Sequence, residues 1–371
     1  MTHVSPALTV FAALGSLVST MAAQSTPQFS GHRFEAGATP NFVAIGDLNG
    51  DGIFDLVATN FYSGNDSVLL GTGAGSFGEQ STFDVGPYPR CVAIGDLNGD
   101  GKPDLATVAE DSGDGHIALS CGMGNGDFGA QTNIGVGGSP FIGTPYSVAI
   151  GDLNGDGIVD LVTANVPGFA SVLLGLGSGT FKTPVAFNVG FDPTSVALGD
   201  LNGDGIPDVT TANFSSGGVS VLLGSGTGSF GVHKEFSVGG HAASVAIGDL
   251  NGDGIPDITT AKVFQNEGAV LFGNGTGSFG PYVTIPVGIT PSGAVIGDLN
   301  GDGLLDVVTA NSASKNVSVL LGIGKGRFGA QATFGAGNGP NCVAIGDLDG
   351  NGKPDLVTSN GGSNKLGVFL Q

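Results

Sequence analysis

The stretch Asp47-Leu-Asn-Gly-Asp-Gly-Ile-Phe-Asp55 decides the fold, because close copies of it recur along the 371 residues of the chain. The seven copies begin at Asp47, Asp96, Asp152, Asp200, Asp249, Asp298 and Asp347, at intervals of 49, 56, 48, 49, 49 and 49 residues. A period near 50 residues is typical of propellers and linear arrays, in which each unit is one supersecondary module. The chain is therefore one repeat architecture.

Each copy predicts four short strands. In the fourth copy they are Ser195–Gly199, Asp208–Asn213, Gly218–Leu223 and Lys234–Val238, which are separated by turns rich in Gly, Asn, Asp and Pro. No segment has a helical period, so the unit is an antiparallel meander. One such sheet cannot bury both of its faces, whereas blades packed around a ring can. The sequence predicts an all-β fold, a seven-bladed β-propeller of four-stranded antiparallel blades.

The two ends of the chain predict how the ring closes. The seventh copy supplies only three strands, the last of them Lys365–Leu370. Near the other end, Phe29 and His32–Gly37 align with Phe77 and Thr82–Gly86, where the first unit has its fourth strand. We expect this N-terminal strand to complete the last blade, which removes an exposed sheet edge.

Residues 1–23 predict a signal peptide. Ala7–Val18 is apolar and too short for a convincing membrane span, and small residues follow at Thr20–Ala23. An ordinary apolar tail is the alternative. We therefore expect the propeller to occupy residues 24–371 of a secreted protein that is extracellular, periplasmic or at the cell surface, with no membrane span. The three cysteines, Cys91, Cys121 and Cys342, lack the spacing of a disulfide framework.

The repeated acidic loop predicts a calcium site. Side-chain oxygens at positions 1, 3, 5 and 9 and the backbone carbonyl at position 7 suit a hard cation, whereas zinc prefers His and Cys. Gly50 and Gly52 allow the backbone to curl. Position 12 is Ala58 instead of the Glu of an EF-hand. We expect about seven structural Ca²⁺ ions, held by Asp47, Asn49, Asp51, Ile53, Asp55, Asp96, Asn98, Asp100, Lys102, Asp104, Asp152, Asn154, Asp156, Ile158, Asp160, Asp200, Asn202, Asp204, Ile206, Asp208, Asp249, Asn251, Asp253, Ile255, Asp257, Asp298, Asn300, Asp302, Leu304, Asp306, Asp347, Asp349, Asn351, Lys353 and Asp355.

The charge distribution agrees with such loops. The net charge is −21, which argues against nucleic acid and anionic membranes as partners. Three acids in each of seven loops make 21 of the 32 Asp and Glu residues. Seven Ca²⁺ would add +14 and reduce −21 to −7. An Asx-rich turn that binds no metal is the alternative.

With these motifs, the chain resembles the FG-GAP (VCBS) repeat family, whose propeller is also found in integrin α chains. The resemblance rests on the acidic loops and on the closing Phe-Gly pairs, with Phe181-Lys182 as a departure, and it covers residues 29 to 371. It implies calcium between the two inner strands of each blade and ligand binding on the opposite face. The pairs are Phe77-Gly78, Phe128-Gly129, Phe230-Gly231, Phe279-Gly280 and Phe328-Gly329.

The opposite face carries two sets of connections. Five extra residues fall within Gly137–Tyr146, and Glu110–His116 is longer than its counterparts by two. Most second strands end in Asn, and Glu110 and Lys262 are expected to break that pattern. Loops on a rigid scaffold carry function, so we expect a partner here; variation without a ligand is the alternative. The expected contact residues are Tyr62, Tyr88, Arg90, Glu110, His116, Phe141, Tyr146 and Phe191.

A protein-binding, adhesion-type scaffold is the favoured function. Some fungal lectins resemble this architecture, but they stack sugars on Trp or Tyr in most blades, and this chain has no Trp and four Tyr. Some polysaccharide lyases are also built on propellers, but His32, His116, His233 and His241 are dispersed along the chain. We expect a monomer that is not an enzyme and binds a protein or, alternatively, a glycan.

Overall fold

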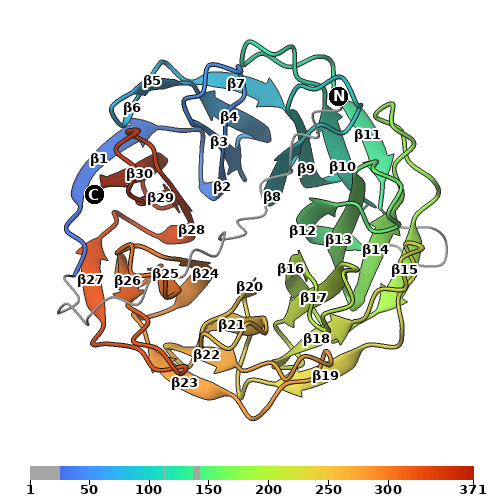
Figure 1. Ribbon diagram of the computed structural model, residues 1–371. Helices are drawn as coiled ribbons and strands as arrows, with labels where there is room; N and C mark the ends of the chain where they lie inside the picture. The colour runs from blue at the N-terminus through green and yellow to red at the C-terminus, as the bar shows by residue number, and fades with distance from the viewer. Residues whose placement is uncertain (1–25, 112–113, 137–142) are drawn as a thin grey trace.

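Seven antiparallel sheets stand around a ring in the computed structural model, which describes residues 26–111, 114–136 and 143–371 (Figure 1). The predicted all-β, seven-bladed propeller of four-stranded blades is confirmed. The expected signal peptide lies outside the described residues. Within those residues, no helical segment has the length and apolarity to span a membrane.

Each blade runs from an inner strand near the centre of the ring to an outer strand at its rim (Figure 1). Blades one to four are β2 (Pro40–Gly46), β3 (Asp55–Asn60), β4 (Asn65–Leu69) and β7 (Ser81–Asp84); β8 (Cys91–Gly95), β9 (Asp104–Asp111), β10 (Asp114–Ser120) and β11 (Thr132–Gly135); β12 (Thr144–Gly151), β13 (Asp160–Val166), β14 (Phe169–Leu173) and β15 (Val185–Asn188); and β16 (Pro193–Gly199), β17 (Asp208–Asn213), β18 (Gly218–Leu222) and β19 (Lys234–Ser237). Blades five to seven are β20 (Ala246–Gly248), β21 (Asp257–Lys262), β22 (Glu267–Leu271) and β23 (Val283–Pro286); β24 (Pro291–Gly297), β25 (Asp306–Asn311), β26 (Asn316–Leu320) and β27 (Ala332–Gly335); and β28 (Pro340–Gly346), β29 (Asp355–Asn360), β30 (Lys365–Leu370) and β1 (Ser30–Glu35). A small hairpin, β5 (Gly71–Gly73) and β6 (Ser76–Phe77), precedes β7.

The glycine that precedes each acidic loop makes room for the next blade. A Cβ on Gly95 would lie 2.5 Å from Cδ1 of Ile150 in blade three. The same relation holds at the closure of the ring, where a Cβ on Gly346 would lie 3.1 Å from Cδ1 of Ile45 in blade one. The Ile-Gly-Asp sequence therefore supplies both partners of a contact that runs from blade to blade.

The phenylalanine of the Phe-Gly pair joins blades near the rim. Its ring meets, edge to face, a phenylalanine on the outer strand of the preceding blade, an arrangement worth about 0.5–1.5 kcal/mol beyond burial. Four such pairs have centroids 5.1 to 5.4 Å apart: Phe34–Phe77, Phe83–Phe128, Phe187–Phe230 and Phe236–Phe279. Phe29, which Ser30 follows, makes the same contact with Phe334 at 5.0 Å.

The N-terminal strand closes the ring as predicted. β1 pairs antiparallel with β30, from Ser30 opposite Leu370 to Glu35 opposite Lys365, and the two strands lie side by side in Figure 1. An ion pair of 2.5 Å joins Lys365 Nζ to Glu35 Oε1. Phe34 then packs against Phe77 of blade one. The last blade is therefore built from both ends of the described chain.

Deletion of Ser30–Glu35 should destabilise the whole ring. It leaves β30 as an unpaired edge and removes the Phe34 ring from the boundary between blades seven and one. We expect loss of a single cooperative melting transition in calorimetry and aggregation in light scattering. The control Glu35→Gln, which removes only an exposed charge, should melt like the native chain, and an unaltered melt for the deletion would contradict closure by β1.

Candidate functional site

The aspartate at position 9 of each acidic loop is fully buried and binds the backbone. In the first loop, Asp55 accepts the N–H of Leu48 through Oδ2 and the N–H of Gly71 through Oδ1, both at 2.7 Å. All seven copies repeat this pair of hydrogen bonds at 2.7 to 2.9 Å. This carboxylate therefore fixes the acidic loop to the segment that follows the third strand.

The remaining loop oxygens lie nearer to solvent and order the turn. Asp47 Oδ1 accepts the N–H groups of Gly50 and Asp51, and Oδ2 accepts that of Gly52. Gly50 and Gly52 have φ of 76° and 81°, and a Cβ at either would meet nothing within 4 Å. These glycines are therefore required by backbone conformation and not by lack of space.

The loop carboxylates repel one another, which fits a cation site. Burial is the largest cause that raises the pKa of Asp306 to about 7, and repulsion from Asp298 and Asp302 adds to it. In the seventh loop, ligand oxygens of Asp347, Asp349 and Asp355 lie within 4.8 Å of one another. The other six loops have Asn at position 3. Carboxylate and amide oxygens are ligands that Ca²⁺ prefers.

The opposite face is formed by the hairpins after the second strands and the links between blades. In four links one residue has φ of 52° to 57°, namely Thr39, Tyr88, Asp192 and Thr290. A proline follows each of these residues. In five blades the residue after the corresponding proline falls in a register shift of the inner strand, a bulge that redirects its side chain: Asn41, Tyr146, Thr194, Ser292 and Asn341.

An aromatic cluster occupies this face over blade one and its link to blade two. The ring of Phe61 lies 5.1 Å from the rings of both Tyr62 and Tyr88. Tyr62 and Tyr88 are 71% and 46% exposed, unusually high for large aromatic side chains. Because the Phe61 ring contacts both tyrosine rings, it supports the exposed tyrosines in this aromatic cluster.

Arg90 links this aromatic cluster to blades two and three. Its guanidinium lies 5.1 Å from the centroid of Phe61 and 3.9 Å from that of Tyr146, distances at which cation–π attraction operates. Glu110 Oε2 lies 3.5 Å from the guanidinium, and the Nε atom is buried without a hydrogen-bond partner in the described chain. Arg90 thus joins side chains of three blades.

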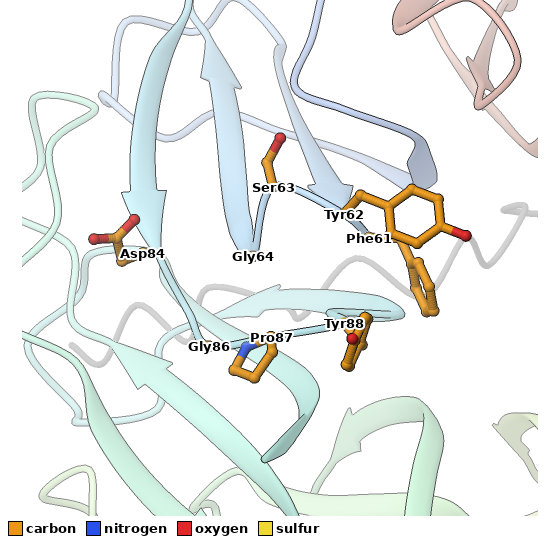
Figure 2. Close-up of a pocket in the computed structure, with 8 residues that line it drawn as sticks. All are labelled: Phe61, Tyr62, Ser63, Gly64, Asp84, Gly86, Pro87 and Tyr88. Carbon is orange, nitrogen blue, oxygen red and sulfur yellow. The ribbon is translucent and has the colours of Figure 1, made fainter. Parts of the chain in front are cut away.

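A cavity of about 380 Å³ lies beside the tyrosines. Figure 2 shows the rings of Phe61, Tyr62 and Tyr88 gathered at one end and Asp84 at the other. Ser63, Gly64, Gly86 and Pro87 complete the lining. The cavity therefore combines an aromatic wall with an exposed carboxylate, on the face opposite the acidic loops.

Several predicted contact residues lie elsewhere than expected. His116 was predicted to be exposed, but it is only 7% exposed in β10, with Nε2 3.4 Å from the carbonyl of Val85. The extra residues of Glu110–His116 lengthen β9 and β10, which pair as far as Asp111 and Asp114, because hydrogen bonding to the partner strand satisfies the added backbone. Tyr146 is half-buried at the β12 bulge beneath Arg90. Phe141 lies outside the described residues.

Other predictions need smaller corrections. Arg90 and Glu110 are half-buried and paired with each other. Glu110 does not occupy the position of the strand-ending Asn; the register places Ala109 opposite His116, where Asn60 faces Asn65 in blade one. Phe191 is 69% exposed, but its link joins blades three and four.

Phe61 and Asp84 were not predicted as site residues. Both flank tyrosine-bearing turns, and the adjacent pair Phe61-Tyr62 occurs only once among the repeats, a departure that could have identified them.

Comparisons with known proteins agree with this architecture. No curated protein matches the chain. Among solved structures, BBS1N in complex with ARL6DN has a TM-score of 0.61 at 16% identity, over 91% of this chain and 93% of that one. An Agrocybe aegerita lectin that recognises non-reducing terminal N-acetylglucosamine has 0.56 at 21%, over 88% and 86%. An inactive virginiamycin B lyase from Staphylococcus aureus with quinupristin has 0.62 at 12%, over 93% and 100%. Identities this low show a shared fold alone.

One family model matches most of the chain. It describes an FG-GAP-like repeat and matches residues 47–107, 96–163, 152–211, 200–260, 259–309 and 298–358. Five of the six matches begin at the first aspartate of an acidic loop, whose buried position 9 aspartate holds its blade together. The chain belongs to the FG-GAP-like repeat family.

Proposed function

We propose that this protein is a secreted, calcium-stabilised propeller that binds a protein partner, as an adhesion-type scaffold, through the face opposite its acidic loops. One observation carries the proposal: Tyr62 and Tyr88 stand exposed beside a cavity, supported by Phe61 and Arg90. Aromatic side chains on rigid support are the usual anchors of interfaces. The ring provides that rigidity because its blades are joined all the way around.

The chemistry of this site supports binding and not catalysis. A general acid or base needs a free titratable group close to a reacting atom. Here Arg90 and Glu110 are paired with each other, and Asp84 is the one carboxylate among the described residues that line the cavity. His116, the nearest imidazole along the sequence, is buried against Val85.

A carbohydrate ligand is the second candidate. Exposed tyrosines beside Ser63 and Asp84 could stack on a sugar ring and bond its hydroxyls. The lectin of the same fold makes this class worth testing. A protein partner is favoured because the tyrosines do not recur around the ring: Ser215 stands in blade four where Tyr62 stands in blade one, and Asp192 stands where Tyr88 stands.

Calcium in the acidic loops is the second part of the proposal. Positions 1, 3 and 5 and the carbonyl at position 7 would hold the ion, together with the position 9 carboxylate where its backbone bonds permit. A bound cation would replace the mutual repulsion of the loop carboxylates by attraction. The buried position 9 aspartate already organises each loop, so the ion would be needed for stability and not for the path of the chain.

Removal of calcium should lower the melting temperature. Sites of extracellular type bind with Kd of about 10⁻⁴–10⁻³ M. At about tenfold excess, each loop contributes roughly 1.4 kcal/mol, and seven independent loops about 10 kcal/mol. We expect calorimetry to show a large decrease in Tm with EDTA that is reversed by Ca²⁺ and not by Mg²⁺.

Two variants of one loop separate the ion from the backbone bonds. Asp204→Ala removes an exposed position 5 ligand and the acceptor of one exposed backbone N–H, that of Ile206. It should reduce bound calcium, measured by mass spectrometry, with a small loss of stability. Asp208→Ala also removes the acceptor of the Leu201 and Gly224 N–H groups, and it should destabilise even in EDTA. Native melting in EDTA with no metal bound would refute the calcium proposal.

Replacement of the exposed tyrosines should abolish partner binding. The double variant Tyr62→Ser, Tyr88→Thr uses residues that blades four and six have at these positions, and Thr290 has the same positive φ as Tyr88. Interface aromatics contribute about 2 kcal/mol each, so affinity should fall by at least an order of magnitude. The ligand class is identified first, by applying the native protein to arrays of extracellular proteins and of glycans.

The control for this experiment is Phe191→Ala, which removes an equally exposed ring from another link. It should bind like the native protein, and all variants should keep their calcium content and melting temperature. If the double variant binds normally, the partner contacts another part of the ring and the site assignment is wrong.

A further inference from the structure

Asp66 is a carboxylate in a position that is otherwise apolar. It is fully buried in β4. The strand registers place a residue without a polar side chain at the same point of every other blade: Ile117, Ala170, Val219, Gly268, Val317 and Leu366. A lone buried carboxylate costs several kcal/mol if it is ionised, so its presence here demands an explanation.

The contacts of Asp66 cross the boundary between blades one and two. Its Oδ2 is joined by a 2.5 Å hydrogen bond to the hydroxyl of Thr107 in β9. Its Oδ1 is buried without a hydrogen-bond partner in the described chain. A protonated carboxyl tolerates this apolar setting, whereas a carboxylate there would need water or a cation beside it.

Burial and one hydrogen bond set the pKa of Asp66. Burial raises the pKa of Asp66 to about 7, and the Thr107 hydroxyl acts in the opposite direction. The nearby strands carry Asp55, Asp84, Cys91, Asp104, Glu110 and His116. Burial raises the pKa of Cys91 to about 11, and the charge of Asp66 adds to the increase. Cys91 therefore stays neutral while Asp66 titrates.

The strands of Asp66 and Thr107 both connect to segments near the tyrosine site. Asp66 follows the hairpin that bears Tyr62 and Gly64, and it lies opposite Phe83, the neighbour of Asp84. Thr107 is on the strand that continues to Glu110, the partner of Arg90. One wall of the cavity, Tyr62 to Gly64, precedes the strand of Asp66. The other wall, Asp84 to Tyr88, contacts the strand of Thr107, because the N–H of Glu110 donates to the carbonyl of Pro87 at 3.1 Å.

We propose that the contact between Asp66 and Thr107 is a pH-sensitive latch between blades one and two that regulates the Tyr62–Tyr88 site. This inference rests on the proposed function of that site. When Asp66 is protonated, the boundary is closed and the tyrosines are held together. When it loses its proton, the charge draws water into the boundary, and the hairpin and the link move relative to each other.

The sign of the effect follows from the raised pKa. The fold favours the protonated form, so this contribution to stability is fully present below the unfolded pKa of about 4 and is lost as pH rises through about 7. The latch is therefore closed in mildly acidic solution and released in mildly alkaline solution.

Tyrosine NMR tests the latch, because the chain has only four tyrosines. Protein labelled with ¹³C at the tyrosine ring is titrated from pH 5 to 8.5 in saturating calcium, which keeps the acidic loops in one state. We expect the Tyr62 and Tyr88 signals, assigned by Tyr→Phe variants, to shift together with a midpoint near neutral pH. The Tyr282 signal, from blade five, should not follow them.

Variants of Asp66 identify the group responsible. Asp66→Asn keeps the shape and cannot titrate; Asp66→Val supplies the residue that blades four and six have there, in case the amide does not fold. Either should abolish the shared transition and raise Tm relative to the native protein at pH 8. Glu79→Gln, which removes an exposed acid of the same blade, should leave the transition in place.

The outcomes separate the latch from the site. If the transition persists without Asp66, or if no transition occurs in the native protein, the latch is refuted, whether or not the tyrosines bind a partner. If the transition depends on Asp66 but the double tyrosine variant binds its partner normally, the latch stands as a property of the ring and the proposed function is wrong.

Discussion

Each blade depends on one buried aspartate that accepts two backbone N–H groups. Asp55 and its six counterparts bind the start of the acidic loop on one side and the residue after the third strand on the other. A charged acceptor makes these bonds about twice as strong as neutral ones. Burial raises the pKa of Asp55 above its ordinary value, and a nearby cation would favour the charged form.

The regular ring depends on contacts that recur from boundary to boundary. Small Gly95 faces Ile150, and the phenylalanines of successive blades meet at the rim. Such contacts fix the geometry but distinguish no blade from another. Our proposed site lies where a blade departs from the pattern, as blade one does with Tyr62, Tyr88 and Asp66.

Two of these departures are linked in space. Tyr62 lies in the hairpin that precedes the strand of Asp66, and Tyr88 lies in the link that the strand of Thr107 contacts through the Glu110–Pro87 hydrogen bond. Arg90 connects the same corner to blade three. A binding surface and a buried titratable group that share two strands can influence each other without a long pathway. Arg90 limits the movement of the hairpin relative to the link, because its guanidinium stacks on both Phe61 and Tyr146.

The number of blades, the strand order and closure by the N-terminal strand could be predicted from the sequence, because each depends on a motif that repeats with a nearly constant period. The exposure of Tyr62 and Tyr88 could also be predicted, because both lie in short turns between predictable strands. Only the tertiary structure decided that His116 is buried, that Tyr146 lies under Arg90, and that Asp66 reaches Thr107, 41 residues further along the chain. These contacts depend on the packing of one blade against the next and on bulges in the inner strands, and neither is encoded in the local pattern of a single repeat.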